Sequence, residues 1–127
     1  RGNDATRYMA AGGYGEYAKD LFARTRAQRL LLEFDDERSG DFAPLAEVPD
    51  DKFVVLGLIT TKFPRQETEE EIKARVGEAA RFVDMERLAL STQCGFASVA
   101  KGNNLGFDLQ ETKLSLVARA ARALWPN

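Results

Sequence analysis

Short apolar runs alternate along the chain with longer segments in which apolar residues recur at helical spacing. The runs are RLLLEF at 29–34, KFVVLGLITTK at 52–62 and RLALS at 87–91. A short apolar run is typical of a buried strand, and helical spacing is typical of a helix that packs by one face. Strands that are apolar on both faces and separated by helices predict parallel βαβ units, because crossover helices cover a parallel sheet. The pattern therefore predicts an α/β fold.

Three helices are predicted, one before the first run, one after the second and one after the third. Thr68 and Glu71 have the spacing of a capping box, and Asp108 with Glu111 repeats that arrangement. The predicted helices cover about 14–27, 68–84 and 108–125. The residues predicted to face the sheet are Tyr14, Ala18, Leu21 and Phe22, then Ile72, Val76, Ala79, Ala80 and Val83, and finally Leu114, Val117, Ala121 and Leu124.

The segment 35–51 is rich in Asp, Gly and Pro, and we predict a loop there with one short helical turn at 44–47.

Three strands and three helices are too few for a closed eight-stranded barrel, which needs about 250 residues. The chain is therefore expected to be either a small open sheet or the last third to half of a barrel. It begins with Arg1 and not Met, which we interpret as a piece of a longer or trimmed protein.

Composition restricts the class of protein. Of the 127 residues, 44% are hydrophobic and 30% are charged, which is typical of a globular domain. No apolar run approaches the roughly 20 residues that span a bilayer, so no membrane partner is expected. A net charge of −2 argues against a nucleic-acid partner, because it provides no basic surface for phosphates. One Cys and no signal sequence favour a reducing, cytoplasmic location.

Candidate chemistry lies where the predicted strands end, because ligands meet parallel strands at their carboxyl ends. Glu33 ends the first run, Thr60, Thr61 and Lys62 end the second, and Cys94 follows the third. A carboxylate, a basic side chain and a thiol are therefore expected on one rim. The absence of His excludes a Ser-His-Asp or Cys-His mechanism within the chain.

Each of these residues also has a structural interpretation. A single Cys beside a strand is commonly a small buried apolar residue, and Lys62 is also consistent with a solvated strand end. Glu33 is costly to bury without a partner, and Arg38 is a candidate partner for it. The acidic run 67–71 is interpreted as a helix start and not a metal site. The motif GGYG at 12–15 lacks the preceding strand and the lysine of a P-loop, so it is weak evidence for phosphate binding.

Several segments together resemble the carboxyl-terminal part of the cobalamin-independent methionine synthase family. They are RGN at 1–3, LLLEFDDERSGDFAPL at 30–45, VVLGLITTKFP at 54–64 and LALSTQCGFAS at 88–98. The resemblance covers nearly the whole chain and includes the family's shorter relatives, among them epoxyalkane:coenzyme M transferase. It implies a (β/α)8 TIM barrel, of which this chain is a single partial domain at 1–127, the carboxyl-terminal portion.

The resemblance also implies a zinc site at the carboxyl ends of the barrel strands. In the family the ligands are a His and a Cys in an H-x-C motif, a Glu and a second Cys. Glu33 matches the glutamate and Cys94 the second cysteine. In the shorter relatives H-x-C runs directly into RGN, so the other two ligands are expected before Arg1, outside this chain. Zinc bound by sulfur, nitrogen and carboxylate donors holds a thiol substrate as its thiolate.

The resemblance implies that the full-length protein carries out zinc-dependent methyl transfer to homocysteine in methionine biosynthesis. This chain alone is expected to be inactive. Methionine synthases carry Asp-Ile-His-Ser where this chain has Thr60, Thr61, Lys62 and Phe63. That difference argues against a folate donor and leaves Lys62 as a candidate catalytic residue. The alternatives are an epoxyalkane:coenzyme M-type alkyltransferase, a metal-free barrel of the uroporphyrinogen decarboxylase type, and a non-catalytic domain. Expected partners are a small-molecule thiol and either a second copy or the missing half of the barrel.

Overall fold

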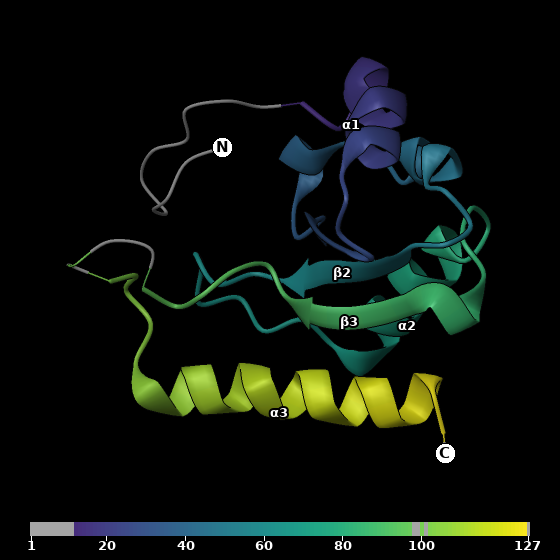
Figure 1. The fold of residues 1–127 in the computed structure, drawn as a ribbon. Helices are drawn as coiled ribbons and strands as arrows, with labels where there is room; N and C mark the ends of the chain where they lie inside the picture. Colours follow the sequence, from purple (N-terminus) through teal and green to yellow (C-terminus); the bar gives the residue numbers. More distant parts are fainter. Residues whose placement is uncertain (1–11, 98–99, 101, 127) are drawn as a thin grey trace.

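The computed structural model describes residues 12–97, 100 and 102–126, and within them a parallel sheet has three strands in the order β1-β2-β3. The strands are β1 (Arg29–Glu33), β2 (Phe53–Ile59) and β3 (Leu88–Thr92). They run in the same direction, as the arrows of β2 and β3 show in Figure 1. The predicted parallel α/β fold is confirmed. The second strand is shorter than predicted, because it ends before Thr60.

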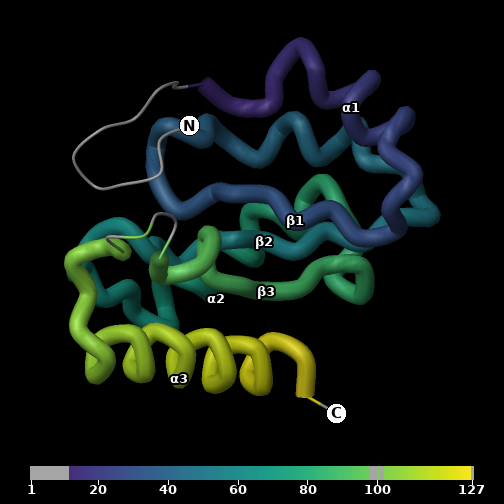
Figure 2. The backbone as a smooth tube through the Cα atoms, turned by 60° about the vertical axis from the view of Figure 1, so that its left-hand side comes forward, coloured from purple at the N-terminus to yellow at the C-terminus, as the bar shows by residue number. Residues whose placement is uncertain are grey.

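Three α-helices accompany the sheet in the described part of the chain: α1 (Ala18–Arg24), α2 (Glu69–Ala79) and α3 (Phe107–Leu124). The helix α2 connects β2 to β3, and α3 follows β3 and contacts both β3 and α2. Figure 2 shows α1 beyond the β1 edge of the sheet and α3 beyond the β3 edge. The 3-10 turns are η1 (Gly15–Tyr17), η2 (Glu37–Ser39), η3 (Ala43–Glu47) and η4 (Met85–Arg87).

The predicted helix boundaries need correction at both ends of the chain. The first predicted helix is reduced to α1 with a 3-10 turn before it, and Leu21 is exposed instead of buried. The third helix begins at Phe107 with Gly106 as its N-cap and no side-chain cap, so the predicted cap at Asp108 is wrong. Asp108 lies inside the first turn, where its side chain is no longer placed to cap the free N–H groups.

The inward face of α3 is also rotated from the predicted one. Leu114 is 54% exposed, whereas Leu116 and Ala120 are buried. The residue that shares their face one turn earlier is Lys113, which is 1% exposed. A search for apolar residues at helical spacing passes over a lysine and selects the leucine beside it, which explains the error.

The capping box at the start of α2 is confirmed. The Thr68 hydroxyl accepts a hydrogen bond from the Glu71 backbone N–H at 3.1 Å, and the Glu71 carboxylate accepts one from the Thr68 backbone N–H at 2.8 Å. That second bond holds the pKa of the Glu71 carboxyl below its ordinary value of 4.5. A lowered pKa means that the carboxylate favours the folded state at higher pH and loses this effect as the pH falls below 4.5.

We predict that Thr68→Ala lowers the free energy of unfolding by about 1 kcal/mol at neutral pH, because the cap hydroxyl is lost. The difference between variant and wild type should shrink as acid protonates Glu71, because the Thr68 side chain also helps to lower the pKa of the Glu71 carboxyl and this contribution exists only in the wild type. Urea unfolding at several pH values measures this difference. Equal stabilities at neutral pH, or a difference that does not change with pH, would contradict the prediction.

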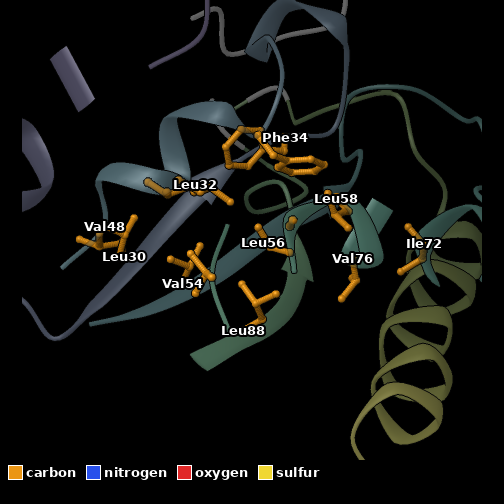
Figure 3. Packing of buried hydrophobic residues seen from close by; sticks show 14 of the residues in the cluster. Leu30, Leu32, Phe34, Val48, Val54, Leu56, Leu58, Ile72, Val76 and Leu88 are labelled. Atoms are coloured by element: carbon orange, nitrogen blue, oxygen red, sulfur yellow. The ribbon is translucent and has the colours of Figure 1, made fainter. Parts of the chain in front are cut away.

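Within the described residues, the sheet buries one face under helices and covers the other face less completely. Figure 3 shows Leu30, Leu32, Val54, Leu56, Leu58 and Leu88 of the strands with Ile72 and Val76 of α2 in one apolar cluster. On the opposite face, Leu31 is 72% exposed, and Val55 and Ala89 are half-buried. The expectation that the strands are buried on both faces is met on one face only. An apolar second face is what strands of a closed barrel direct toward the barrel interior.

The glycines of the GGYG segment have a structural explanation. A Cβ added to Gly13 would lie 2.7 Å from the carbonyl oxygen of Ser39 and 3.4 Å from the Cα of Gly40. The Gly12 N–H donates to the Arg38 carbonyl at 2.9 Å. The segment is therefore glycine-rich because its backbone packs directly against another backbone segment.

Within the described residues, no helix combines the length and the apolar character that crossing a bilayer requires.

Candidate active site at the strand ends

The structure places the predicted site residues at one edge of the sheet. Glu33 is the last residue of β1, Thr60 to Lys62 follow β2 directly, and Cys94 lies just beyond β3. The register aligns Glu33 with Gly57 and Gly57 with Ser91, so the three carboxyl ends lie side by side. The rim that the sequence predicts is therefore present.

Cys94 is half-buried and has polar neighbours. Its Sγ accepts a hydrogen bond from Lys62 Nζ at 3.2 Å and lies 3.3 Å from Thr61 Oγ1. It also lies within donating distance of Gln93 Oε1, at 3.3 Å, and of the Gly95 carbonyl, at 3.4 Å. These neighbours are polar groups at a strand end, unlike the apolar surroundings of a cysteine that only fills a core.

Lys62 and Thr61 are buried, so the solvated interpretation of Lys62 is wrong. Lys62 is 3% exposed and Thr61 is 0% exposed. The Thr61 hydroxyl donates to Gln93 Oε1 at 2.9 Å, and its single proton can point instead at the Cys94 sulfur. An ammonium group and a rotatable hydroxyl beside one sulfur form a setting that suits a sulfur carrying negative charge.

Glu33 is half-buried, and its backbone is held by Tyr14. The Glu33 N–H donates to the Tyr14 hydroxyl oxygen at 3.0 Å. The Tyr14 ring packs against Phe22 and Phe34, with centroids 5.8 and 5.4 Å apart. Arg38, the proposed partner of Glu33, donates from Nε to Asp36 at 2.7 Å and also forms an ion pair with it through Nη2. Tyr14 thus links α1 and the core to the strand end that carries the carboxylate.

Sequence reasoning missed several residues that build the site. Gln93 is buried and contacts both Thr61 and Cys94. Asn103 donates from Nδ2 to the Thr61 carbonyl at 2.8 Å. Glu67, which the sequence assigned to a helix start, accepts a hydrogen bond from the Thr60 N–H at 2.9 Å. Polar side chains in loops carry no periodic signal, so only the folded chain reveals these contacts.

Gly57 keeps the space between the two candidate ligand strands free of a side chain. A Cβ at this position would lie 3.1 Å from Gln93 Cα and from the Leu32 carbonyl oxygen, and 3.2 Å from the Thr92 carbonyl oxygen. The β2–β3 register also shifts between Gly57 and Ile59. Glycine here allows the three strand ends to approach closely.

The donor set fits part of a zinc site. A thiol at Cys94 and a carboxylate at Glu33 are donors that zinc accepts, and they lie on one edge of the sheet. Among the described residues, no group of three or more His, Cys, Asp and Glu side chains is arranged to hold a metal ion. A zinc ion at this edge would therefore require ligands beyond these two.

Comparison with known proteins identifies a protein family and two similar proteins. Residues 19–115 match the family described as cobalamin-independent synthase, catalytic domain. The Bacillus subtilis (strain 168) proteins YxjH and YxjG are 44% and 43% identical to this chain over 126 residues. The match covers 98% of this chain and 33% of each relative, so the chain spans about a third of the length of these proteins.

Two solved structures have a similar fold. A B12-independent methionine synthase from Shewanella sp. W3-18-1, in complex with selenomethionine, matches 87% of this chain with a TM-score of 0.71 and 22% identity. A Listeria monocytogenes protein assigned as a vitamin-B12-independent methionine synthase matches 91% of this chain with a TM-score of 0.62 and 30% identity. This chain covers 30% and 33% of those chains. The open three-stranded sheet is thus part of a TIM barrel of the methionine synthase type.

Proposed function

The chain belongs to the cobalamin-independent methionine synthase family, and from this premise we propose that it supplies part of a zinc-dependent site for methyl transfer to a thiol. Glu33 and Cys94 are two of the zinc ligands. A His and a Cys from an H-x-C motif of the full-length protein complete the set. When bound, zinc stabilises the thiolate form of a thiol substrate, which is the nucleophile of the reaction.

The observation that carries this proposal is the setting of Cys94. The only thiol of the chain lies just beyond the carboxyl end of β3, with the buried Lys62 Nζ 3.2 Å from its sulfur. A lysine ammonium that donates to a sulfur stabilises negative charge on that sulfur. This contact fits a thiolate at Cys94 that serves as a metal ligand.

The described residues around the sulfur have separable roles in this proposal. Lys62 donates to the Cys94 sulfur and offsets the negative charge that thiolate and carboxylate ligands bring to one site. Thr61 offers a second hydrogen bond to the same sulfur. Gly57 leaves the site face free of a side chain. Lys62 thus acts on a ligand sulfur and takes no part in proton transfer.

Homocysteine is the proposed thiol, with methionine as the product. The fold neighbour from Shewanella forms a complex with selenomethionine, the selenium analogue of that product. The alternative is alkylation of a coenzyme M-type thiol, as in the shorter relatives that the sequence also resembles. It is favoured by the presence of Thr60, Thr61, Lys62 and Phe63 where methionine synthases carry Asp-Ile-His-Ser.

The open face of the sheet is proposed to pack against the remaining strands of the barrel in the full-length protein. Leu31 is 72% exposed on this face. Exposed apolar surface and free strand edges favour association. The chain by itself is therefore expected to associate and to lack activity.

An assay of the full-length protein that carries this chain tests the proposed function. The protein should alkylate homocysteine or a coenzyme M-type thiol when given a methyl or alkyl donor. Chelation of zinc should lower the rate of alkylation by a factor of about 100 or more. Added zinc should restore it. Activity that persists without metal would favour the metal-free barrel, and no alkylation of any thiol would contradict the proposal.

A further inference from the structure

The loop that joins β2 to α2 carries Thr61 and Lys62, whose side chains approach the Cys94 sulfur. A buried ion pair holds this loop in place. Lys113 Nζ of α3 lies 2.9 Å from Glu67 Oε2 at the end of the loop. The two side chains are 1% and 5% exposed.

This ion pair reaches both ends of the loop. The second carboxylate oxygen of Glu67 accepts a hydrogen bond from the Thr60 N–H at 2.9 Å. Lys113 also donates to the Arg65 carbonyl oxygen. The start of the loop at Thr60 and its return at Arg65 and Glu67 are therefore fastened to one point on α3.

Stability alone does not explain a buried ion pair here. Lys113 shares the inward face of α3 with Leu116 and Ala120, a position that an apolar residue would fill. Replacing a buried ion pair with well-packed apolar residues is commonly neutral or stabilising, because removing two charges from water is costly. What an ion pair with additional hydrogen bonds provides is a defined geometry.

The ion pair between Glu67 and Lys113 fixes the positions of two side chains in the candidate site. Thr61 and Lys62 follow Thr60 directly, and their contacts with Cys94 Sγ are 3.3 and 3.2 Å long. A displacement of about 1 Å would remove both contacts. We infer that Glu67 and Lys113 are positioning residues, which hold Thr61 and Lys62 against the sulfur of Cys94. The inference deepens the proposed function, since it treats that sulfur as the functional group.

The test uses a charge-free replacement of the pair, Glu67→Gln with Lys113→Met, in the full-length protein. The amide oxygen still accepts from Thr60, so the fold should persist with a melting temperature near that of wild type. The rate at which iodoacetamide alkylates Cys94 in the metal-free protein is followed by mass spectrometry of the peptide that contains it. We expect this rate to change by about threefold or more, in the same direction as in Lys62→Met.

Non-additivity separates positioning from a purely structural role. Adding Lys62→Met to the pair variant should cause little further change, because both changes remove the same contact. A matched control is Glu69→Gln with Lys73→Met, which removes a surface ion pair of 2.7 Å on α2 and should leave the Cys94 rate unchanged. A folded pair variant with the wild-type Cys94 rate, or full additivity with Lys62→Met, would overturn the inference.

Glu67→Gln alone provides a second test if the pair variant does not fold. It keeps the shape of the side chain and an acceptor for Thr60, and it should shift the Cys94 rate in the same direction by a smaller factor. An unchanged rate in this variant would overturn the inference as well. Zinc binding by the same proteins distinguishes the two hypotheses: a wild type that binds no zinc contradicts the proposed function, whereas the alkylation rates decide on positioning.

Discussion

Replacing Cys94 with serine should reduce the zinc content of the full-length protein from about one per chain to a small fraction of that value. The hydroxyl of serine is a much weaker zinc ligand than a thiolate, because its proton is held far more tightly. Methyl transfer to a thiol should fall by about three orders of magnitude or more, since the nucleophile is no longer stabilised. Zinc content by atomic spectroscopy and thiol alkylation by mass spectrometry measure the two effects.

The fold should survive this substitution. The Cys94 side chain is half-buried and surrounded by polar groups, so serine can replace its contacts with Gln93 and Thr61. An unchanged melting temperature of the metal-free protein would show that the loss is local to the site. Full zinc content and activity in Cys94→Ser would favour the metal-free or non-catalytic alternatives.

Gly57→Ala is the second change with a large expected effect. The added methyl group would lie 3.1 Å from Gln93 Cα and from the Leu32 carbonyl oxygen, and backbone atoms in a sheet cannot move aside independently. We expect a loss of about 1–3 kcal/mol in the free energy of unfolding, as for overpacking in a core. Zinc affinity should fall about tenfold, because the methyl group separates the strand ends that carry Glu33 and Cys94.

Gly77→Ala is a suitable control for this prediction. Gly77 lies in α2 with no atom within 4 Å of the position of an added Cβ. Alanine is favoured over glycine in a helix, so this variant should be as stable as wild type or up to about 1 kcal/mol more stable, with unchanged zinc binding. Equal behaviour of the Gly57 and Gly77 variants in denaturant unfolding and zinc titration would contradict the account of Gly57.

The strands and the rim were predictable because their signals are local. Apolar runs located the three described strands, and the rule that ligands meet carboxyl ends of parallel strands selected Glu33, Lys62 and Cys94 from the sequence. The capping box at Thr68 was also recognisable, since its two partners are three residues apart. Each of these features depends on neighbours along the chain.

The features that sequence reasoning missed depend on contacts between distant segments. Lys113 lies inward because Glu67, 46 positions away, supplies its partner, so an apolar pattern selected Leu114 instead. The close approach that requires Gly57 involves three strands at once. The roles of Glu33 and Cys94 as ligands remain predictions from family resemblance, and the structure contributes their common edge and the polar neighbours of the sulfur.

X-ray absorption at the zinc edge of the full-length protein tests the central claim most directly, because it counts the sulfur atoms bound to the metal. The account predicts that the zinc remaining in Cys94→Ser has one sulfur ligand fewer than the zinc of the wild-type protein. The same number of sulfur ligands in both proteins would contradict the assignment of Cys94 as a ligand, and with it the proposed site.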